Sequence, residues 1–108
     1  MNQSENLLVN IAEECAEIQQ AVAKALRFGL KNHHPDDTSG DITSMNNYHI
    51  YKEYLQLSYL IRQAVSLGIL PFLPTSEVEK IKSEKASSFF FWLGASVMEG
   101  TVEKGIEL

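Results

Sequence analysis

Residues 5–28, with the sequence ENLLVNIAEECAEIQQAVAKALRF, decide the fold class of this chain. Their apolar side chains recur at steps of three and four residues, which is the spacing of one face of an α-helix. The members of this stripe are Leu7, Leu8, Ile11, Cys15, Ile18, Val22, Ala25 and Leu26. Ser4 is the expected N-cap, and Gly29 follows the stripe as a typical helix-ending glycine. The sequence therefore predicts a helix over residues 5–28.

A polar stretch and a second helical pattern follow. The stretch LKNHHPDDTSGDITSMNN contains Pro35 and Gly40 and predicts a long loop. The adjacent histidines His33 and His34 lack the spacing of a zinc or di-iron site. A second helix is expected from near residue 43 or 44 to Gly68. Its apolar stripe is Ile50, Tyr54, Leu57, Ile61, Ala64 and Val65.

A third helix is expected over about residues 77–98, after a turn with two prolines. Ser76 and Glu79 have the spacing of a capping box at its start, and Gly94 is a candidate break. There is little strand signal anywhere in the chain. The predicted fold is therefore all-α, a single domain over residues 1–108. We expect an antiparallel helical bundle of three to four helices, completed by oligomerisation.

Bulk composition narrows the class of protein. The chain has 108 residues, 44% of them apolar and 21% charged, as expected for a globular domain. Its net charge of −5 argues against nucleic-acid binding, which needs a basic surface. The N-terminus does not read as a signal peptide, and no apolar run approaches the ~20 residues of a membrane span. The lone Cys15, expected to be a buried thiol, is compatible with a cytoplasmic location.

Carboxylates gather beside the apolar face of the first helix. Glu13, Glu14 and Glu17 are close together there, with Glu14 at the border of the stripe. Glu53 lies among apolar neighbours on the second helix, where packing would bury its charge. A buried charge needs a cation or a proton. Packing the two stripes would bring Glu14, Glu17 and Glu53 together, and Mg²⁺ prefers such oxygen ligands.

Lys85 on the third helix is a positively charged residue in an apolar position, as Glu53 is a negatively charged one. Its helical neighbours are apolar: Val78, Ile81, Phe89 and Trp92. An ammonium group in that position requires an anion, either a glutamate or a phosphate. Two simpler interpretations stay open: the glutamates of the first helix form a solvated surface, or Glu53 and Lys85 form a structural ion pair in an oligomerisation domain.

Two stretches together resemble the MazG-like, all-α nucleoside triphosphate pyrophosphohydrolase superfamily. They are EECAEIQQAVAKALRFG (13–29) and YKEYLQLSYLIRQAVSLGIL (51–70). The superfamily carries E-E-x-x-E on one helix and E-x-x-D on the next. The first motif corresponds to Glu13, Glu14 and Glu17. The second begins at Glu53 but has Gln56 in place of the aspartate.

The resemblance implies Mg²⁺-dependent hydrolysis of a nucleoside triphosphate between its α- and β-phosphates, with Mn²⁺ as a possible substitute. The expected role would include house-cleaning of non-canonical nucleotides. The implied catalytic residues are Glu13, Glu14, Glu17 and Glu53. The implied metal ligands are Glu14, Glu17, Glu53 and Gln56. The implied phosphate-binding residues are Lys24, Arg27 and Lys85.

The sequence leaves alternatives open. The neutral Gln56 is compatible with a nucleotide-binding or regulatory module of weak or no activity, and the superfamily also includes phosphoribosyl-ATP pyrophosphatases. Several aromatic residues could stack on a base or belong to the core: Tyr48, Tyr51, Tyr54, Phe89 and Trp92. The aromatic run at residues 89–92 cannot face one core. We therefore expect a homodimer, with a tetramer as the alternative.

Overall fold

The computed structural model describes residues 1–31 and 40–103, and all regular secondary structure in these ranges is helical. The helices are α1 (Gln3–Phe28), the 3₁₀ turn η1 (Ile42–Ser44), α2 (Asn46–Ser66) and α3 (Thr75–Met98). The all-α prediction is confirmed. His33 and His34 lie outside the described residues. No helix in the described ranges is long and apolar enough to cross a membrane.

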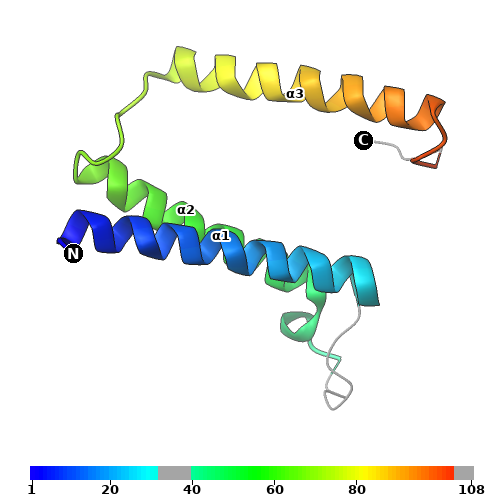
Figure 1. Cartoon of the computed structure of the whole chain (residues 1–108), viewed down its shortest axis with the longest axis horizontal. Helices are drawn as coiled ribbons and strands as arrows, with labels where there is room; N and C mark the ends of the chain where they lie inside the picture. The colour runs from blue at the N-terminus through cyan, green and yellow to red at the C-terminus, as the bar shows by residue number, and fades with distance from the viewer. Residues whose placement is uncertain (32–39, 104–108) are drawn as a thin grey trace. The chain divides into compact units, whose positions relative to one another are not determined.

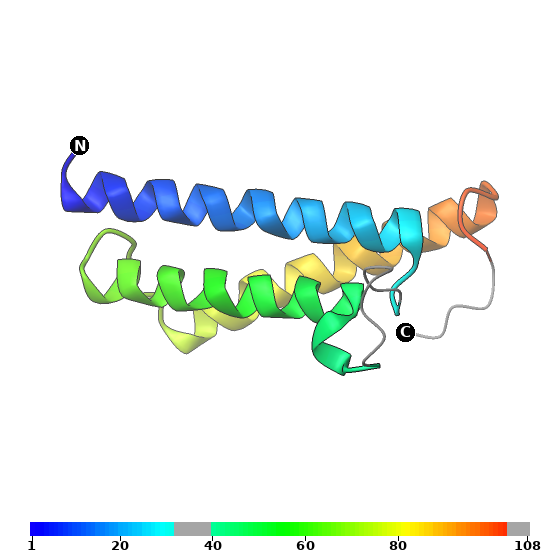
Figure 2. The same ribbon diagram turned by 90° about the horizontal axis from the view of Figure 1, so that it is seen from below.

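The chain divides into two compact units, the first covering Met1–Pro71 and the second beginning at Phe72. In the first unit, α1 and α2 lie side by side and run in opposite directions, as Figure 1 and Figure 2 both show. Two hydrogen bonds join the end of α1 to the start of α2. The Asn46 side chain donates to the Gly29 carbonyl at 2.9 Å, and the Asn47 amide donates to the Leu30 carbonyl at 2.7 Å. These bonds hold the end of α1 beside the start of α2.

The ends of α1 are set by a capping box and a glycine. Asn2, not Ser4, is the N-cap: its side chain accepts from the Glu5 amide at 2.8 Å, and the Glu5 carboxylate accepts from the Asn2 amide at 3.2 Å. The prediction for Ser4 was wrong because this reciprocal pair starts the helix two residues earlier. Gly29 ends α1 as predicted, with a φ of 100° that favours glycine.

The other helix boundaries differ by a few residues from the prediction. Residues 42–44 form η1, capped by Asp41, and α2 begins only at Asn46. On α3, the proposed capping box of Ser76 and Glu79 is wrong. The helix begins directly after Pro74, whose carbonyl accepts from the Glu77 and Val78 amides, so Ser76 lies inside it. The helix also continues through Gly94 to Met98.

The seam between α1 and α2 is built around small residues. Ala21, Ala25 and Ala64 are the buried apolar residues of the described chain, with exposed fractions of 7%, 6% and 0%. Larger seam residues are half-buried, among them Ile11, Ile18, Leu57 and Leu60. Two helices cannot enclose large side chains from all directions, so the core of the first unit is a thin strip.

The apolar stripe predicted on α1 spans two faces, and α2 covers only one of them. Ile11 and Ile18 turn toward the seam, whereas Leu8, Val22 and Leu26 are 46%, 38% and 84% exposed. Cys15 belongs to this uncovered face and is exposed. The prediction of a buried thiol was therefore wrong, because the stripe is wider than the contact that one partner helix can make.

Candidate metal centre

Three carboxylates from the two helices meet at the α1–α2 seam. Glu14 and Glu17 are one turn apart on α1, and Glu53 faces them from α2. Each offers an oxygen, and these oxygens all lie within 4.8 Å of one another. The predicted meeting of these residues is thus present in the structure. We call Glu14, Glu17 and Glu53 the acidic triad.

Burial distinguishes this triad from an ordinary surface cluster. Glu14 and Glu53 are half-buried, whereas Glu17 is exposed. The Oε2 atoms of Glu14 and Glu53 are both buried and have no hydrogen-bond partner among the described residues. Leaving a buried acceptor unsatisfied costs about 1–3 kcal/mol, and more when it is charged. These oxygens are therefore open to a partner that donates a hydrogen bond or carries positive charge.

The electrostatics of Glu17 point in the same direction. Its pKa is raised above 4.5, first by hydrogen bonding with Glu53 and then by the negative charge of Glu53. Partial desolvation and the charge of Glu13 raise this pKa further, while a hydrogen bond with Glu14 lowers it. A proton held between Glu17 and Glu53 relieves the repulsion between carboxylates, and a divalent cation does so more completely.

The donor set of the triad fits a hard divalent cation. It consists of carboxylate oxygens, which Mg²⁺ and Mn²⁺ prefer over nitrogen or sulfur donors. The exposed side of Glu17 also leaves room for water, and Mg²⁺ usually retains several waters. The two unpartnered buried oxygens are the observation that makes this fit more than a count of acidic residues.

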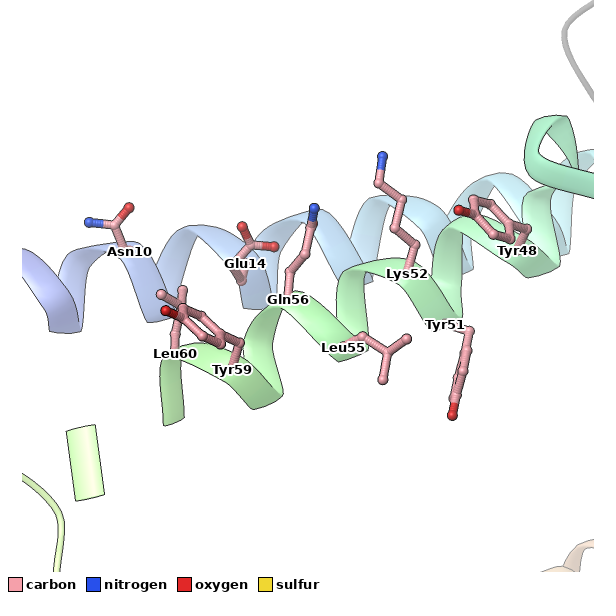
Figure 3. Close-up of a pocket in the computed structure, with 9 residues that line it drawn as sticks. All are labelled: Asn10, Glu14, Tyr48, Tyr51, Lys52, Leu55, Gln56, Tyr59 and Leu60. Carbon is pink, nitrogen blue, oxygen red and sulfur yellow. The ribbon is translucent and has the colours of Figure 1, made fainter. Parts of the chain in front are cut away.

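A groove adjoins the triad and shares Glu14 with it. It has a volume of about 510 Å³ and is open to solvent. Its lining comes from α1 and from one face of α2 (Figure 3), and includes Asn10, Glu14, Lys52, Gln56 and Tyr59. Gln56 is exposed one turn from Glu53, on the border between groove and triad.

The basic residues predicted to bind phosphate on α1 have no contact with the triad among the described interactions. Lys24 and Arg27 are exposed near the end of α1, and the Arg27 guanidinium lies 5.2 Å from the centre of the Phe28 ring. Within the described residues, no ion pair joins either to the triad. Lys85 is exposed on α3, in the second unit. The phosphate-binding roles of these three residues stay predictions.

Two groove residues were missed by the sequence reasoning. Lys52 directly precedes Glu53 and lines the groove, yet it lies outside the apolar stripe on which the reasoning relied. Tyr59 is 63% exposed and also lines the groove. The sequence signal that could have identified them is their spacing from Gln56 on α2: Tyr59 lies three residues after it and Lys52 four residues before it, so all three share a helix face. Glu13 is exposed on α1, and its charge contributes to the raised pKa of Glu17.

Comparison with known proteins gave no match: no protein family, no curated sequence and no solved structure is significantly similar to this chain.

Proposed function

We propose that this protein is a Mg²⁺-dependent nucleotide pyrophosphohydrolase. It would cleave a ribo- or deoxyribonucleoside triphosphate between its α- and β-phosphates to a nucleoside monophosphate and pyrophosphate. The observation that carries the proposal is the acidic triad, with its two buried, unpartnered carboxylate oxygens. The E-E-x-x-E and E-x-x-Q motifs, on antiparallel helices, support it.

The triad would hold the cation, with Gln56 as a neutral fourth ligand. When bound, the cation would supply charge neutralisation for the phosphate oxygens. Phosphoryl transfer requires mainly positioning and charge compensation, so a site of carboxylates and surrounding cations needs no covalent nucleophile. This role accounts for the concentration of like charges at the seam, which is unfavourable in the cation-free protein.

The remaining residues have simple roles in this reaction. Water forms a bond to the α-phosphorus, and the bond from that phosphorus to the bridging oxygen breaks, releasing pyrophosphate and a proton. Glu13, exposed beside the triad, would accept a hydrogen bond from the attacking water and receive its proton. Lys24 and Arg27 would compensate charge on the phosphates.

We also propose that the protein is a homo-oligomer, a dimer or a tetramer. Large apolar side chains stay exposed on α1 and α2, among them Leu26 at 84%, Tyr51 at 62% and Tyr54 at 52%. On α3, Phe89, Phe90, Phe91 and Trp92 are 47%, 53%, 67% and 65% exposed. Large apolar side chains exposed together on one helix, as at residues 89–92, are typical of a protein interface.

The decisive experiment is a panel of nucleoside triphosphates with Mg²⁺, assayed separately for pyrophosphate and for orthophosphate. Pyrophosphate and the monophosphate should appear in equal amounts from at least one substrate, and EDTA should stop the reaction. Release of orthophosphate alone, or activity that survives EDTA, would contradict the mechanism.

The second candidate is a nucleotide-binding module without efficient turnover. It is favoured by one observation, the neutral Gln56 at the border of the triad. An amide oxygen holds Mg²⁺ less strongly than a carboxylate. This candidate predicts metal-dependent nucleotide binding in the same panel without pyrophosphate release.

A further inference from the structure

The groove beside the acidic triad is long enough to hold a nucleotide lengthwise. Its lining extends along α2 from Tyr48 to Leu60, a rise of about 18 Å at about 1.5 Å per residue. Its volume of about 510 Å³ lies within the range of small-molecule sites. Glu14 belongs to both the groove and the triad, and Figure 3 shows it between Asn10 and Lys52. A ligand whose phosphates lie over the triad would therefore extend toward both ends of the groove.

Asn10 presents an oriented acceptor at one end. Its side-chain nitrogen donates to the Asn6 carbonyl at 2.8 Å and to Asn6 Oδ1 at 3.2 Å. A carbonyl only accepts, so the nitrogen must face Asn6 and the amide oxygen must point the other way. Figure 3 shows this oxygen on the side of Glu14. Asn10 Oδ1 accepts no hydrogen bond from the described residues, and it is therefore ready to accept one from a ligand.

An aromatic and an aliphatic side chain accompany this acceptor. Tyr59 and Leu60 line the same end of the groove, and Tyr59 is 63% exposed. A tyrosine ring exposed in a groove offers a stacking face for a planar ring, worth about 1–3 kcal/mol per base in single-strand binding proteins. The combination of a stacking face with a single oriented acceptor is suited to a heterocycle that carries a hydrogen-bond donor.

The opposite end of the groove carries positive charge. Lys52 lies one turn before Gln56 on α2, on the side of Glu14 away from Asn10 (Figure 3). In order along α2, the groove therefore presents a ring-binding end, the triad border and a cation. A nucleoside triphosphate has the same order of base, α-phosphate and terminal phosphates.

We propose that the Asn10–Tyr59 end of this groove binds the base of the nucleotide and selects bases with an exocyclic amino group, such as cytosine or adenine. The amino group donates to Asn10 Oδ1, the ring stacks on Tyr59, and the terminal phosphates extend toward Lys52. A carbonyl at the same position of the base, as in uracil or hypoxanthine, would face the Asn10 oxygen and be repelled. The inference rests on the proposed function for the position of the phosphates.

Binding can be measured without turnover, using α,β-methylene analogues that resist cleavage at the proposed bond. Isothermal titration with Mg²⁺ would compare the CTP with the UTP analogue, and the ATP with the ITP analogue. In each pair that binds, the amino member should bind about tenfold more tightly, which corresponds to about 1.4 kcal/mol from one hydrogen bond. Equal binding within a pair, tighter binding of the carbonyl member, or no binding by either pair would overturn the proposal.

Variants at three residues test which side chains cause the preference for bases with an amino group. Asn10→Ala should reduce the preference to about twofold or less, and it places a good helix former in α1. Gln19→Ala is the matched control, since residue 19 lies on the opposite face of α1, and it should retain the preference. Tyr59→Ala should weaken both members of a pair. An unchanged preference in Asn10→Ala, or unchanged affinity in Tyr59→Ala, would place the base elsewhere.

The outcome is independent of the hydrolysis assay. Base-selective binding without pyrophosphate release would retain the base site and contradict the enzymatic function. Pyrophosphate release with no base selectivity in either pair would support the enzymatic function and contradict the base site.

Discussion

The Glu17 carboxylate on α1 and the Glu53 carboxylate on α2 are neighbours across the helix seam, and Glu53 raises the pKa of Glu17 above 4.5. Their proximity joins two helices through groups that repel each other when both are ionised. The cation-free hairpin is therefore electrostatically strained at the position where the proposed cofactor binds, which makes the effects of charge removal predictable.

Glu53→Gln should weaken Mg²⁺ binding and remove activity while leaving the cation-free protein folded. The variant keeps the size of the side chain and removes one of three clustered charges, so its Tm in EDTA should rise slightly. Loss of one carboxylate ligand should lower metal affinity by at least about tenfold, or about 1.4 kcal/mol. Calorimetric titration and thermal unfolding test both parts. Glu103→Gln, a change at an exposed residue outside the triad, should alter neither. Full activity in Glu53→Gln would show that the triad is misassigned.

The stability of the cation-free protein should fall as pH rises above about 4.5. The folded state raises the pKa of Glu17, so it binds this proton more tightly than the unfolded chain does. The resulting stabilisation is complete below the unfolded pKa and is lost as pH rises through the raised folded pKa. Thermal unfolding in EDTA across this range should show a decline that is smaller in Glu17→Gln. Identical pH profiles for the two proteins would contradict the predicted proximity.

Gln56→Asp should tighten Mg²⁺ binding if residue 56 is a metal ligand. A carboxylate at this position would restore the E-x-x-D pattern, and Mg²⁺ affinity should rise by about tenfold or more, because a charged carboxylate is a stronger ligand for this cation than a neutral amide. Gln63→Asp adds the same charge two turns further along α2 and serves as the control. If both substitutions change the affinity equally, general electrostatic attraction explains the effect and Gln56 is not a ligand.

Asn2→Ala should destabilise the protein by about 1 kcal/mol, whereas Ser4→Ala should have little effect. The difference follows from the reciprocal hydrogen bonds between Asn2 and Glu5. Denaturant unfolding of the two variants tests it directly. Equal destabilisation by both changes would mean that Ser4 contributes to the cap in solution.

Light scattering at micromolar concentration should give a mass of two or four chains. Leu26→Glu and Phe91→Glu place charges at residues that are 84% and 67% exposed in the isolated chain. A charge buried in an interface is costly, so the variant whose residue lies in the contact should dissociate. A monomeric wild-type protein would refute the oligomer.

Helix class and the acidic triad were predictable from sequence because both depend on local periodicity. Glu14 and Glu17 share a helix face by their spacing, and the apolar neighbours of Glu53 direct it to the seam. Cys15 could not be placed in this way: the stripe on α1 covers two faces, and only the position of α2 determines which one is buried. The helix starts were missed for a similar reason. Asn2 and Pro74 compete with Ser4 and Ser76 as start positions, and local preference alone does not rank them.

Lys52 and Tyr59 illustrate a further limit of the sequence reasoning. Exposed polar and aromatic residues on α2 have no periodic pattern that separates a ligand site from an ordinary surface. Their grouping becomes visible only when the groove beside Glu14 is formed by the packed hairpin.

The alanines of the seam have a consequence for evolution and engineering of this site. Ala21 lies one turn beyond Glu17 and is 7% exposed, where a larger side chain would wedge the two helices apart. Any such enlargement would lengthen the Glu17–Glu53 separation without touching either carboxylate. The geometry of the acidic triad is therefore governed by chemically inert positions, and engineering of the proposed cation site should start from the width of the seam.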